Sequence, residues 1–391
     1  MRVVIASRIF SPEPAAAAFR LEALATALAA RGHEVEVLTS RPPAAQPIAD
    51  PPGVRVRRAP VLRDAGGAVR GYLQYLSFDV PLALRLLLVR RPDAVVVEPP
   101  PTTGAVVRAV CALRRIPYVY YAADILADAA RSAGSPSSVV AVVRLLERGS
   151  WRGAARVLSV SPTVTARLRE LGVAAERIAE VGNGIDTSVF TDAGEAVERD
   201  EPYALYAGTA SEVHGAGVFV EAIARVTGMR LVFLGAGVER AALRQRAESI
   251  APGRVEFHDT VGAAEVARWL RGARVAVASV KPEGGYGFAF PTKLYAAAAT
   301  GTPLLYAGEG PGRAFASAAP LGEAVAHDPA AVAEALIRLR NTAPTAAERA
   351  ELARWARGEV SIDAAAGRAA AAVEACGTMN SIPDSKRSEH P

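Results

Sequence analysis

The chain has 391 residues, of which 51% are hydrophobic, and its formal net charge is +5. This length exceeds what one hydrophobic core usually organises, so we expect two domains of about 180 residues each. The two cysteines, Cys111 and Cys376, exclude a disulfide framework and a cysteine-based metal site, and they fit a reducing compartment.

The opening run MRVVIASRIF is too short for the apolar segment of a secretory signal, and we interpret it as a first buried strand. The sequence has no uninterrupted run of about 18 apolar residues, so we expect no transmembrane helix. We therefore expect a cytoplasmic protein, either free or attached peripherally to the inner face of the plasma membrane.

Strand-like apolar runs alternate with helix-like segments through the first half of the chain. Strands are expected at 2–6, 34–38, 54–57, 94–98, 118–122 and 156–160, with helices such as 15–31, 103–114 and 162–171 between them. Near-continuous apolar strands joined by helical crossovers are typical of a parallel sheet covered on both faces.

The second half repeats this alternation. Its strands are expected at 204–207, 231–234, 255–258, 275–280 and 304–306. The pattern predicts an α/β protein with two doubly wound, Rossmann-like domains. We place the first domain at 1–190, joined by a C-terminal helix over 363–376, and the second at 201–355, with a linker over 192–201 and a disordered tail over 377–391.

Charge is uneven between the halves. Through residue 185 there are 24 arginines against 15 acidic residues, a balance of +9, whereas the remainder carries −4. This asymmetry favours an anionic partner for the first domain, such as a membrane surface or a lipid phosphate. We expect no nucleic-acid partner, because no basic motif is interleaved with aromatic residues.

Residues 284–301, GGYGFAFPTKLYAAAATG, combine a glycine loop, a helix start and a lysine in the first turn. Pro291 suits a first helical position, and strong helix formers follow it. Backbone N–H groups and the positive end of the helix dipole would then lie beside Lys293, an arrangement that binds phosphate-sized anions. The alternative is an ordinary turn with a solvated lysine.

Seven motifs stand in the order found in family 4 glycosyltransferases, and the chain resembles most closely the bacterial members that act in surface polysaccharide assembly. They are RGHEVEVLTSRP at 31–42, YVYYAADILAD at 118–128, SVSPTVTARLRELGV at 159–173, VGNGIDTSVF at 181–190, YALYAGTASEVHG at 203–215, LVFLGAG at 231–237 and PTKLYAAAATGTPLLYAG at 291–308. The resemblance implies the GT-B architecture, in which two Rossmann-like domains face a cleft, with the acceptor on the first domain and the nucleotide-sugar on the second.

By this resemblance Lys293, with the N–H groups around Gly285, Gly287 and Thr292, holds the departing diphosphate. The sequence has no Asp-x-Asp motif, so we expect no metal and no resident cofactor. The other donor-side residues expected are Gly208, Thr209, His214, Gly235, Gly237, His258, Val261, Glu283 and Leu294. The turn of Gly235 and Gly237 has a second interpretation, tight packing of a strand against a helix.

Three donor-side positions depart from the family pattern. The family commonly has a basic pair where this chain has Thr209 and His214, and a ribose-binding glutamate where it has Ala296. His214 can donate a hydrogen bond, or carry charge if its pKa is raised, whereas Thr209 cannot carry charge. Glu283 is a candidate substitute for the missing glutamate, and Arg20 for the missing basic pair.

Arg20, Glu98 and Asp124 are the acceptor-side candidates. Asp124 follows an apolar strand, where a carboxylate can orient or deprotonate an acceptor hydroxyl, so we name Asp124 and Lys293 as the catalytic pair. The alternatives are a helix N-cap for Asp124, a loop carboxylate for Glu98 and a solvated arginine for Arg20. Residues 70–91 and 139–151 combine apolar bulk with arginine ends, which fits either membrane-surface docking or buried core helices.

The expected function is a glycosyltransferase of the hexosyltransferase type. It would move a sugar from a nucleotide diphosphate sugar, a UDP-sugar, to a saccharide or lipid-linked acceptor in cell-surface polysaccharide or glycoconjugate biosynthesis. Retention of configuration follows from the resemblance alone. The alternatives are a non-catalytic binding or regulatory partner that has lost its donor ligands, supported by Ala296 and Thr209, and another GT-B enzyme such as a nucleotide-sugar epimerase.

Overall fold

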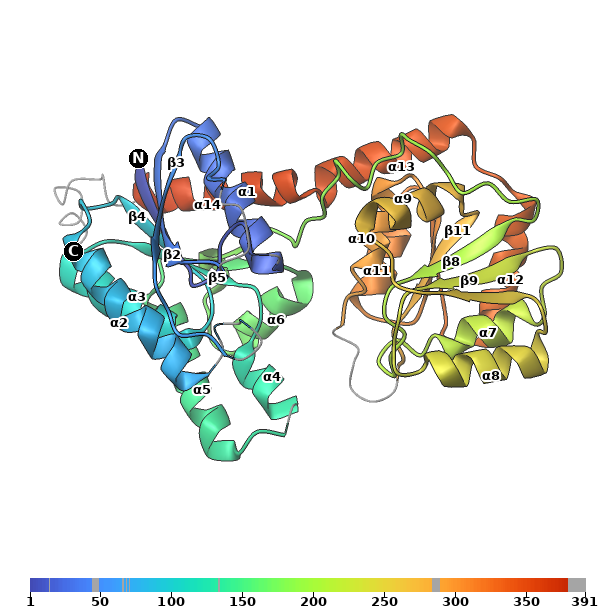
Figure 1. The fold of residues 1–391 in the computed structure, drawn as a ribbon, viewed down its shortest axis with the longest axis horizontal. Helices are drawn as coiled ribbons and strands as arrows, with labels where there is room; N and C mark the ends of the chain where they lie inside the picture. The colour runs from blue at the N-terminus through green and yellow to red at the C-terminus, as the bar shows by residue number, and fades with distance from the viewer. Residues whose placement is uncertain are drawn as a thin grey trace, which may run out of the picture. The chain divides into compact units, whose positions relative to one another are not determined.

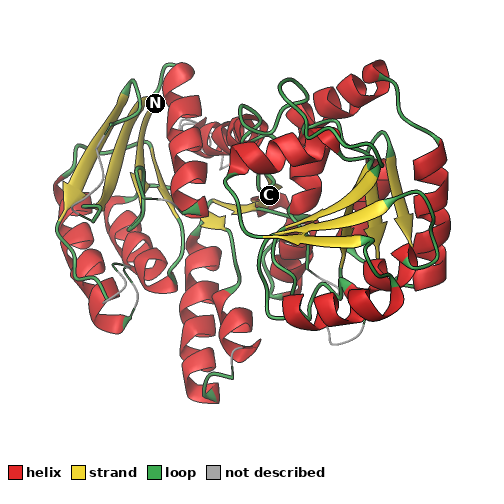
Figure 2. Cartoon of the chain, turned by 45° about the vertical axis from the view of Figure 1, so that its right-hand side comes forward, coloured by secondary structure: helices red, strands yellow, loops and turns green. Residues whose placement is uncertain are grey.

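The computed structural model describes residues 1–13, 15–43, 49–64, 67, 69, 71–132, 134–282 and 289–378 (Figure 1). The chain divides into two compact units. Unit 1 comprises Met1–Asn183 together with the chain from Ala365 onward, and unit 2 comprises Gly184–Ala364. Each unit is a parallel sheet with helices on its faces (Figure 2).

Unit 1 contains a seven-stranded sheet in the order β3-β2-β1-β4-β5-β6-β7. The strands are β1 (Arg2–Ala6), β2 (Glu34–Ser40), β3 (Val54–Ala59), β4 (Ala94–Val97), β5 (Tyr118–Ala122), β6 (Arg156–Ser159) and β7 (Ile178–Glu180). All neighbours pair in parallel, and β1 is an interior strand, with Val3 opposite Val35 on one side and Ala94 on the other. The apolar runs therefore form strands because both of their faces are covered.

The helices of unit 1 form two layers. They are α1 (Ala16–Ala30), α2 (Tyr72–Leu88), α3 (Pro101–Arg114), α4 (Leu126–Ser132), α5 (Ser137–Gly153), α6 (Pro162–Glu170) and α14 (Ile362–Thr378). Leucines of α1 and the Ala369–Val373 side of α14 fill the core on one face of the sheet. Phe78 of α2, Val107 of α3 and Trp151 of α5 fill the core on the other.

Unit 2 contains a six-stranded parallel sheet in the order β10-β9-β8-β11-β12-β13. The strands are β8 (Tyr203–Ala207), β9 (Arg230–Leu234), β10 (Val255–His258), β11 (Val275–Ser279), β12 (Leu304–Ala307) and β13 (Gly322–Val325). The helices are α7 (Gly217–Ile223), α8 (Arg240–Ile250), α9 (Ala263–Gly272), α10 (Lys293–Ala299), α11 (Pro311–Ala318), α12 (Pro329–Asn341) and α13 (Ala346–Glu359). Each sheet thus confirms the predicted doubly wound α/β architecture.

The boundaries of the units differ from the expected ones. Ile185 donates its N–H to the carbonyl of Val360 and accepts the N–H of Ile362, each at 2.8 Å, so the chain joins unit 2 from residue 184 rather than 201. The expected linker over 192–201 is hydrogen-bonded to α9, because Arg271 donates to the carbonyl of Glu195 at 2.7 Å. Residues 377 and 378 belong to α14, and the rest of the expected tail lies outside the described residues.

Two strands were not predicted from the sequence, and both lie at sheet edges. β7 and β13 are the last strands of their sheets, and their residues are only partly buried or exposed. An edge strand pairs on one side only, so it needs no continuous apolar run.

Candidate functional site

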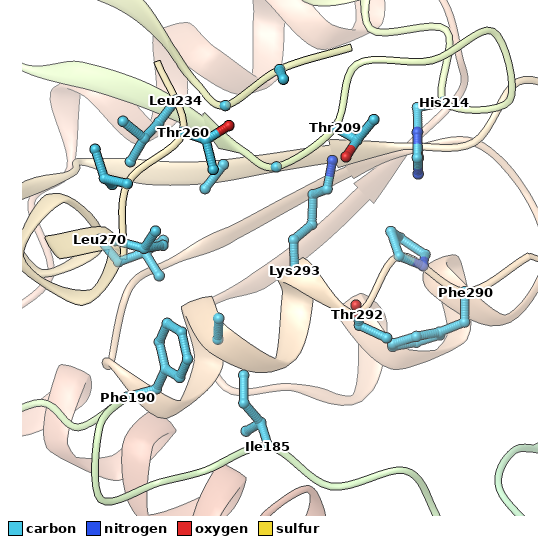
Figure 3. Close-up of a pocket in the computed structure, with 18 residues that line it drawn as sticks. Ile185, Phe190, Thr209, His214, Leu234, Thr260, Leu270, Phe290, Thr292 and Lys293 are labelled. Carbon is cyan, nitrogen blue, oxygen red and sulfur yellow. The ribbon is translucent and has the colours of Figure 1, made fainter. Parts of the chain in front are cut away.

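A cavity of about 530 Å³ opens in unit 2, beyond the carboxyl ends of β8, β9 and β10 (Figure 3). Its volume is within the range of about 300–1,000 Å³ that is usual for small-molecule sites, and ligands of parallel sheets bind at this edge. Its polar lining comes from Thr209, His214, Thr260, Thr292 and Lys293. Its apolar and backbone lining comes from Ile185, Phe190, Ala207, Gly208, Leu234, Gly235, Ala236, Val261, Val266, Leu270, Phe290, Pro291 and Ala296.

Lys293 is the cation of this cavity. Its ammonium nitrogen lies 3.5 Å from the centre of the Tyr206 ring, and it has no hydrogen-bond partner among the described residues. The nitrogen is screened from water although the rest of the side chain is only partly buried. Burial lowers the pKa of Lys293 from 10.5 to about 7. An unpaired buried ammonium is costly, and an anion in the cavity would remove that cost.

Tyr206 is held in place by the loop that follows its own strand. Its hydroxyl donates to the carbonyl of Thr209 at 3.0 Å, and its ring contacts Phe219 and Phe233. Burial raises the pKa of Tyr206, so the phenol stays neutral and its ring face remains available to the Lys293 cation.

Glycines allow the two loops to approach one another at the polar end of the cavity. Gly208 and Gly235 have φ of 123° and 137°, and a Cβ on Gly235 would lie 2.6 Å from the carbonyl oxygen of Gly208. A Cβ on Gly208 would lie 3.7 Å from the Lys293 nitrogen. The positive φ disfavours a side chain at both positions, and at Gly235 a side chain would also clash, so backbone lies directly beside the lysine.

His214 lies at the same end of the cavity, and it is neutral. Burial, with a further contribution from the charge of Lys293, lowers its pKa to about 4. One ring nitrogen, Nδ1, is 2.8 Å from Ser211 Oγ. Of the two roles considered for His214, the lowered pKa excludes the charge and leaves the hydrogen bond to an anion.

The start of α10 also differs from expectation. The helix begins at Lys293, so Pro291 lies two residues before it rather than in its first position. Leu294 is buried and its N–H is already bonded to the carbonyl of Pro291 at 3.0 Å, so Leu294 offers no donor to a ligand. Thr292 and Lys293 remain at the cavity.

The other end of the cavity is apolar. Leu270 and Phe190 project toward it from α9 and from the chain following Ile185, on the side away from His214 (Figure 3). Ala296, where the family pattern has a glutamate, contributes a methyl group to the wall. This end suits a flat, weakly polar group such as a nucleobase.

The structure brings together seven of the expected donor-side residues: Gly208, Thr209, His214, Gly235, Val261, Thr292 and Lys293. Gly237 and His258 support the site without lining it: Gly237 approaches Ala210 so closely that a Cβ would clash, and the His258 carbonyl accepts the N–H of Gly235 at 3.1 Å. Glu283, Gly285 and Gly287 lie outside the described residues.

Ile185, Phe190, Val266 and Leu270 were not predicted, whereas Thr260 lies in the segment 258–261 that the family resemblance places beside the base. Two of them belong to the motif VGNGIDTSVF, which was assigned to the first domain, and this boundary error hid them. Val266 and Leu270 follow the helical four-residue spacing of α9, a signal that core residues share.

In unit 1, Arg20 and Glu98 form a buried ion pair. An Arg20 nitrogen lies 3.3 Å from a Glu98 carboxylate oxygen, and the other oxygen accepts a hydrogen bond from Ser7 at 2.8 Å. The Arg20 guanidinium also lies 5.0 Å from the centre of the Tyr121 ring. Burial raises the pKa of Glu98 despite the nearby arginine. Neither is a solvated surface residue: their ion pair joins α1 to the end of β4, and the hydrogen bond from Ser7 joins Glu98 to the end of β1.

Asp124 is exposed in the loop between β5 and α4. It does not cap α4, because the N–H groups of Leu126 and Ala127 donate to the Glu147 carboxylate at 2.7 and 3.2 Å. The N-cap interpretation of Asp124 is therefore wrong, and its carboxylate stays accessible at the carboxyl end of β5.

Among the described residues, no group of three His, Cys, Asp or Glu side chains could hold a metal ion. Within the same residues, every helix is too short or too polar to cross a bilayer. Both cysteines are buried and unbridged.

Comparison with protein families gives two matches that follow one another along the chain. Residues 16–184 match the model of the glycosyl transferase 4-like domain, and residues 201–342 match the model of the glycosyl transferases group 1. No curated protein matches the chain.

Solved structures share the fold at low identity. The Anabaena protein HepE in complex with UDP and glucose has 15% identity and a TM-score of 0.65, over 96% of this chain and all of that one. Sucrose-phosphate synthase from Thermosynechococcus elongatus has 20% identity and a TM-score of 0.64, over 97% of both chains. WaaG, a glycosyltransferase involved in lipopolysaccharide biosynthesis, has 16% identity and a TM-score of 0.59, over 95% of this chain and 98% of that one.

Proposed function

The chain belongs to the family 4 type of GT-B glycosyltransferases, and we propose that it transfers a sugar from a UDP-sugar bound in the unit 2 cavity. The observation that carries this proposal is the Lys293 ammonium, which is screened from water and has no hydrogen-bond partner among the described residues. The diphosphate of a nucleotide-sugar supplies the negative charge that this position lacks. HepE, which shares the fold, was solved with UDP and glucose.

In the proposed complex the diphosphate lies at the polar end of the cavity. Lys293 neutralises the charge that develops on the diphosphate as its bond to the sugar breaks, and Thr209 and Thr292 offer hydroxyl hydrogen bonds. Neutral His214 can donate from Nε2, provided that its Nδ1 accepts from Ser211. This charge stabilisation needs no metal ion, and metal independence is part of the proposal.

The nucleobase lies at the apolar end. Val261, Val266 and Leu270 provide a surface on which a uracil ring buries its faces. Ala296 offers no carboxylate to the ribose hydroxyls, so the ribose depends on backbone groups and on water for hydrogen bonds. The resulting affinity for the nucleoside moiety is modest, and the diphosphate contributes most of the binding free energy.

On the acceptor side, Asp124 is the proposed general base. Its exposed carboxylate takes the proton of the acceptor hydroxyl, while the acceptor oxygen bonds to the sugar carbon from the same face as the departing diphosphate oxygen. By family resemblance the configuration at that carbon is retained. Arg20 and Glu98 form a positioning pair beneath this end of the sheet.

The proposed acceptor is a saccharide or a lipid-linked saccharide in cell-surface glycoconjugate synthesis. The resemblance to WaaG and the basic first half of the chain support this assignment. We place the protein in the cytoplasm, at the inner face of the membrane, and the two free cysteines fit that reducing compartment.

The test is calorimetry with UDP, UDP-glucose, UDP-galactose and GDP-mannose, followed by assays of donor consumption with and without an acceptor. We expect UDP-sugars to bind and to be consumed only when an acceptor is present. Consumption without an acceptor would favour epimerisation or hydrolysis. Binding of none of the four would favour a non-catalytic partner of the same fold. Asp124→Asn should lower kcat at least about 100-fold and leave donor affinity unchanged.

A further inference from the structure

Three helices on one face of unit 1 expose an unusual number of large apolar side chains. Within the described part of the chain, ten of the fourteen exposed large apolar side chains belong to α2, α3 and α5. We call them the apolar helical face: Tyr72, Leu73, Leu76, Val80, Leu84, Leu87 and Leu88 of α2, Leu113 of α3, and Val142 and Leu145 of α5. The three helices cover the same side of the sheet, and α3 packs between the other two.

Helix α2 is apolar on two sides. Phe78, Leu82 and Leu86 are buried against the sheet, as in any surface helix. On the outer side, Val80 and Leu84 are 65% and 58% exposed, where a soluble helix normally carries polar residues. The core-packing interpretation of this segment therefore holds for one side of the helix, and the opposite, exposed side is free for docking. Exposed apolar patches of this kind mark interaction surfaces.

The exposed charged side chains of these three helices are all positive. Asp79 and Glu147 are the sole acidic residues of the three helices, all of whose residues are described, and they are only 2% and 1% exposed. Asp79 accepts a hydrogen bond from Thr103 at 2.6 Å, and Glu147 caps α4. The exposed charges of the three helices are thus arginines: Arg108 of α3 and Arg148 and Arg152 of α5.

A second cavity, of about 610 Å³, lies at the α5 edge of this face. Arg131, Arg144 and Arg148 line it together with Ser135, Ser137, Val140, Ala141 and Leu145. Arg144 pairs with Asp128 at 3.1 Å, but that carboxylate is also held by Arg167 at 2.6 Å. Exposed Arg131 and Arg148 have no hydrogen bond or ion pair with the described residues. This arginine pocket therefore has an excess of positive charge beside the apolar Leu145.

We propose that the apolar helical face docks unit 1 onto an anionic lipid bilayer, with its leucines and valines among the acyl chains and the arginine pocket on a lipid phosphate. An anionic bilayer has an apolar interior for the exposed leucines and valines, and negatively charged phosphates at its surface for the arginines. A symmetric contact with a second copy would place arginines against arginines, with no exposed carboxylate on these helices to neutralise them. The inference rests on the proposed function in one respect, since a lipid-linked acceptor would be presented at this surface.

Vesicle co-sedimentation tests the proposal. The full chain should sediment with vesicles of phosphatidylcholine containing 30 mol% (about one third) phosphatidylglycerol, and much less with phosphatidylcholine alone. The double variant Val80→Glu, Leu84→Glu should lose at least about tenfold in affinity, and Arg131→Gln with Arg148→Gln about fivefold per arginine. Val238→Glu, at an 87% exposed apolar position of unit 2, and Arg354→Gln, at an exposed arginine of α13, are the matched controls and should bind like the parent.

A variant whose fluorescence changes on binding distinguishes a failure to bind from a failure to fold. Tryptophan at Leu88, which is 76% exposed, should show a blue-shifted emission when the anionic vesicles are added, whereas Val238→Trp should show none. Three outcomes would each contradict the proposed membrane docking. They are a parent protein that stays in the supernatant, a Leu88→Trp emission spectrum that does not shift, and a dimer in solution that the double variant Val80→Glu, Leu84→Glu dissociates. Such a failure with UDP-glucose binding intact would leave the proposed transferase function standing.

Discussion

The ammonium nitrogen of Lys293 lies 3.5 Å from the centre of the Tyr206 ring, with no hydrogen-bond acceptor among the described residues. The ring face attracts the cation but does not replace a carboxylate or water, so burial lowers the pKa of Lys293 to about 7. A bound diphosphate would supply the missing counter-charge. Lys293 therefore loses contact with water in the free protein, and its ammonium group is left available to bind an anion.

Donor affinity should fall as the pH rises above about 7. The free lysine is then mostly neutral, while the bound anion favours the ammonium form, so binding is coupled to proton uptake. We expect up to about a tenfold loss of UDP-glucose affinity per pH unit between 7 and 9. Calorimetry in buffers of different ionisation enthalpy measures the uptake, and an affinity that is flat over this range contradicts the coupling.

Replacing Lys293 by methionine should stabilise the free protein. The folded-state pKa is lowered from 10.5 to about 7, so the penalty for burying the charge is complete below pH 7 and disappears as the pH rises toward 10.5. Lys293→Met removes this penalty, and the gain should be larger at pH 6 than at pH 9 by about 2 kcal/mol or more, because the penalty shrinks by about 1.4 kcal/mol per pH unit above pH 7. Urea unfolding at both pH values measures it. A variant that is less stable at pH 6 would show that the lysine has a partner.

Gly235→Ala should destabilise unit 2 by about 2 kcal/mol or more, because φ is 137° and the new Cβ would lie 2.6 Å from the Gly208 carbonyl oxygen. Gly262→Ala is the matched control, since nothing lies within 4 Å of its Cβ and its φ is −69°. Thermal unfolding of the two variants should separate them clearly. Equal melting temperatures would mean that the two loops do not approach as described.

Arg20→Met should cost about 3 kcal/mol of stability, because it leaves the buried Glu98 carboxylate without its cation. Adding Glu98→Gln should recover part of the loss, since the second change removes the unpaired charge. A double-mutant cycle by urea unfolding measures the coupling. Strictly additive losses would show that the two side chains do not interact.

The alternation of apolar strands and helices was sufficient to predict both sheets. Strands such as Tyr118–Ala122 are buried throughout, so their apolar runs are continuous and their bounds were predicted correctly. β13 was missed because an edge strand needs no such run. The boundary at residue 190 was misplaced because the pairing of Ile185 with Ser361 joins segments far apart in the sequence, which local composition cannot reveal.

The candidate site was predicted where chemistry is tied to a residue type and missed where it depends on packing. A lysine beside glycine loops indicates an anion site, and Lys293, Gly208 and Gly235 meet at the cavity. The neutral state of His214 and the Tyr206 ring beneath Lys293 are properties of burial, which no motif encodes. These two features determine which side chains of the cavity carry a charge when a diphosphate binds.

Binding of UDP-glucose to the parent and to Lys293→Met, measured by calorimetry at pH 6.5 (an acidity at which about half or more of the parent lysine is charged), tests the central claim most directly. The account predicts that the variant stays folded and loses at least about 30-fold in affinity, a loss expected for a charged hydrogen-bond donor in a closed site. Equal affinity of the two proteins would contradict it, because the diphosphate would then not lie on Lys293.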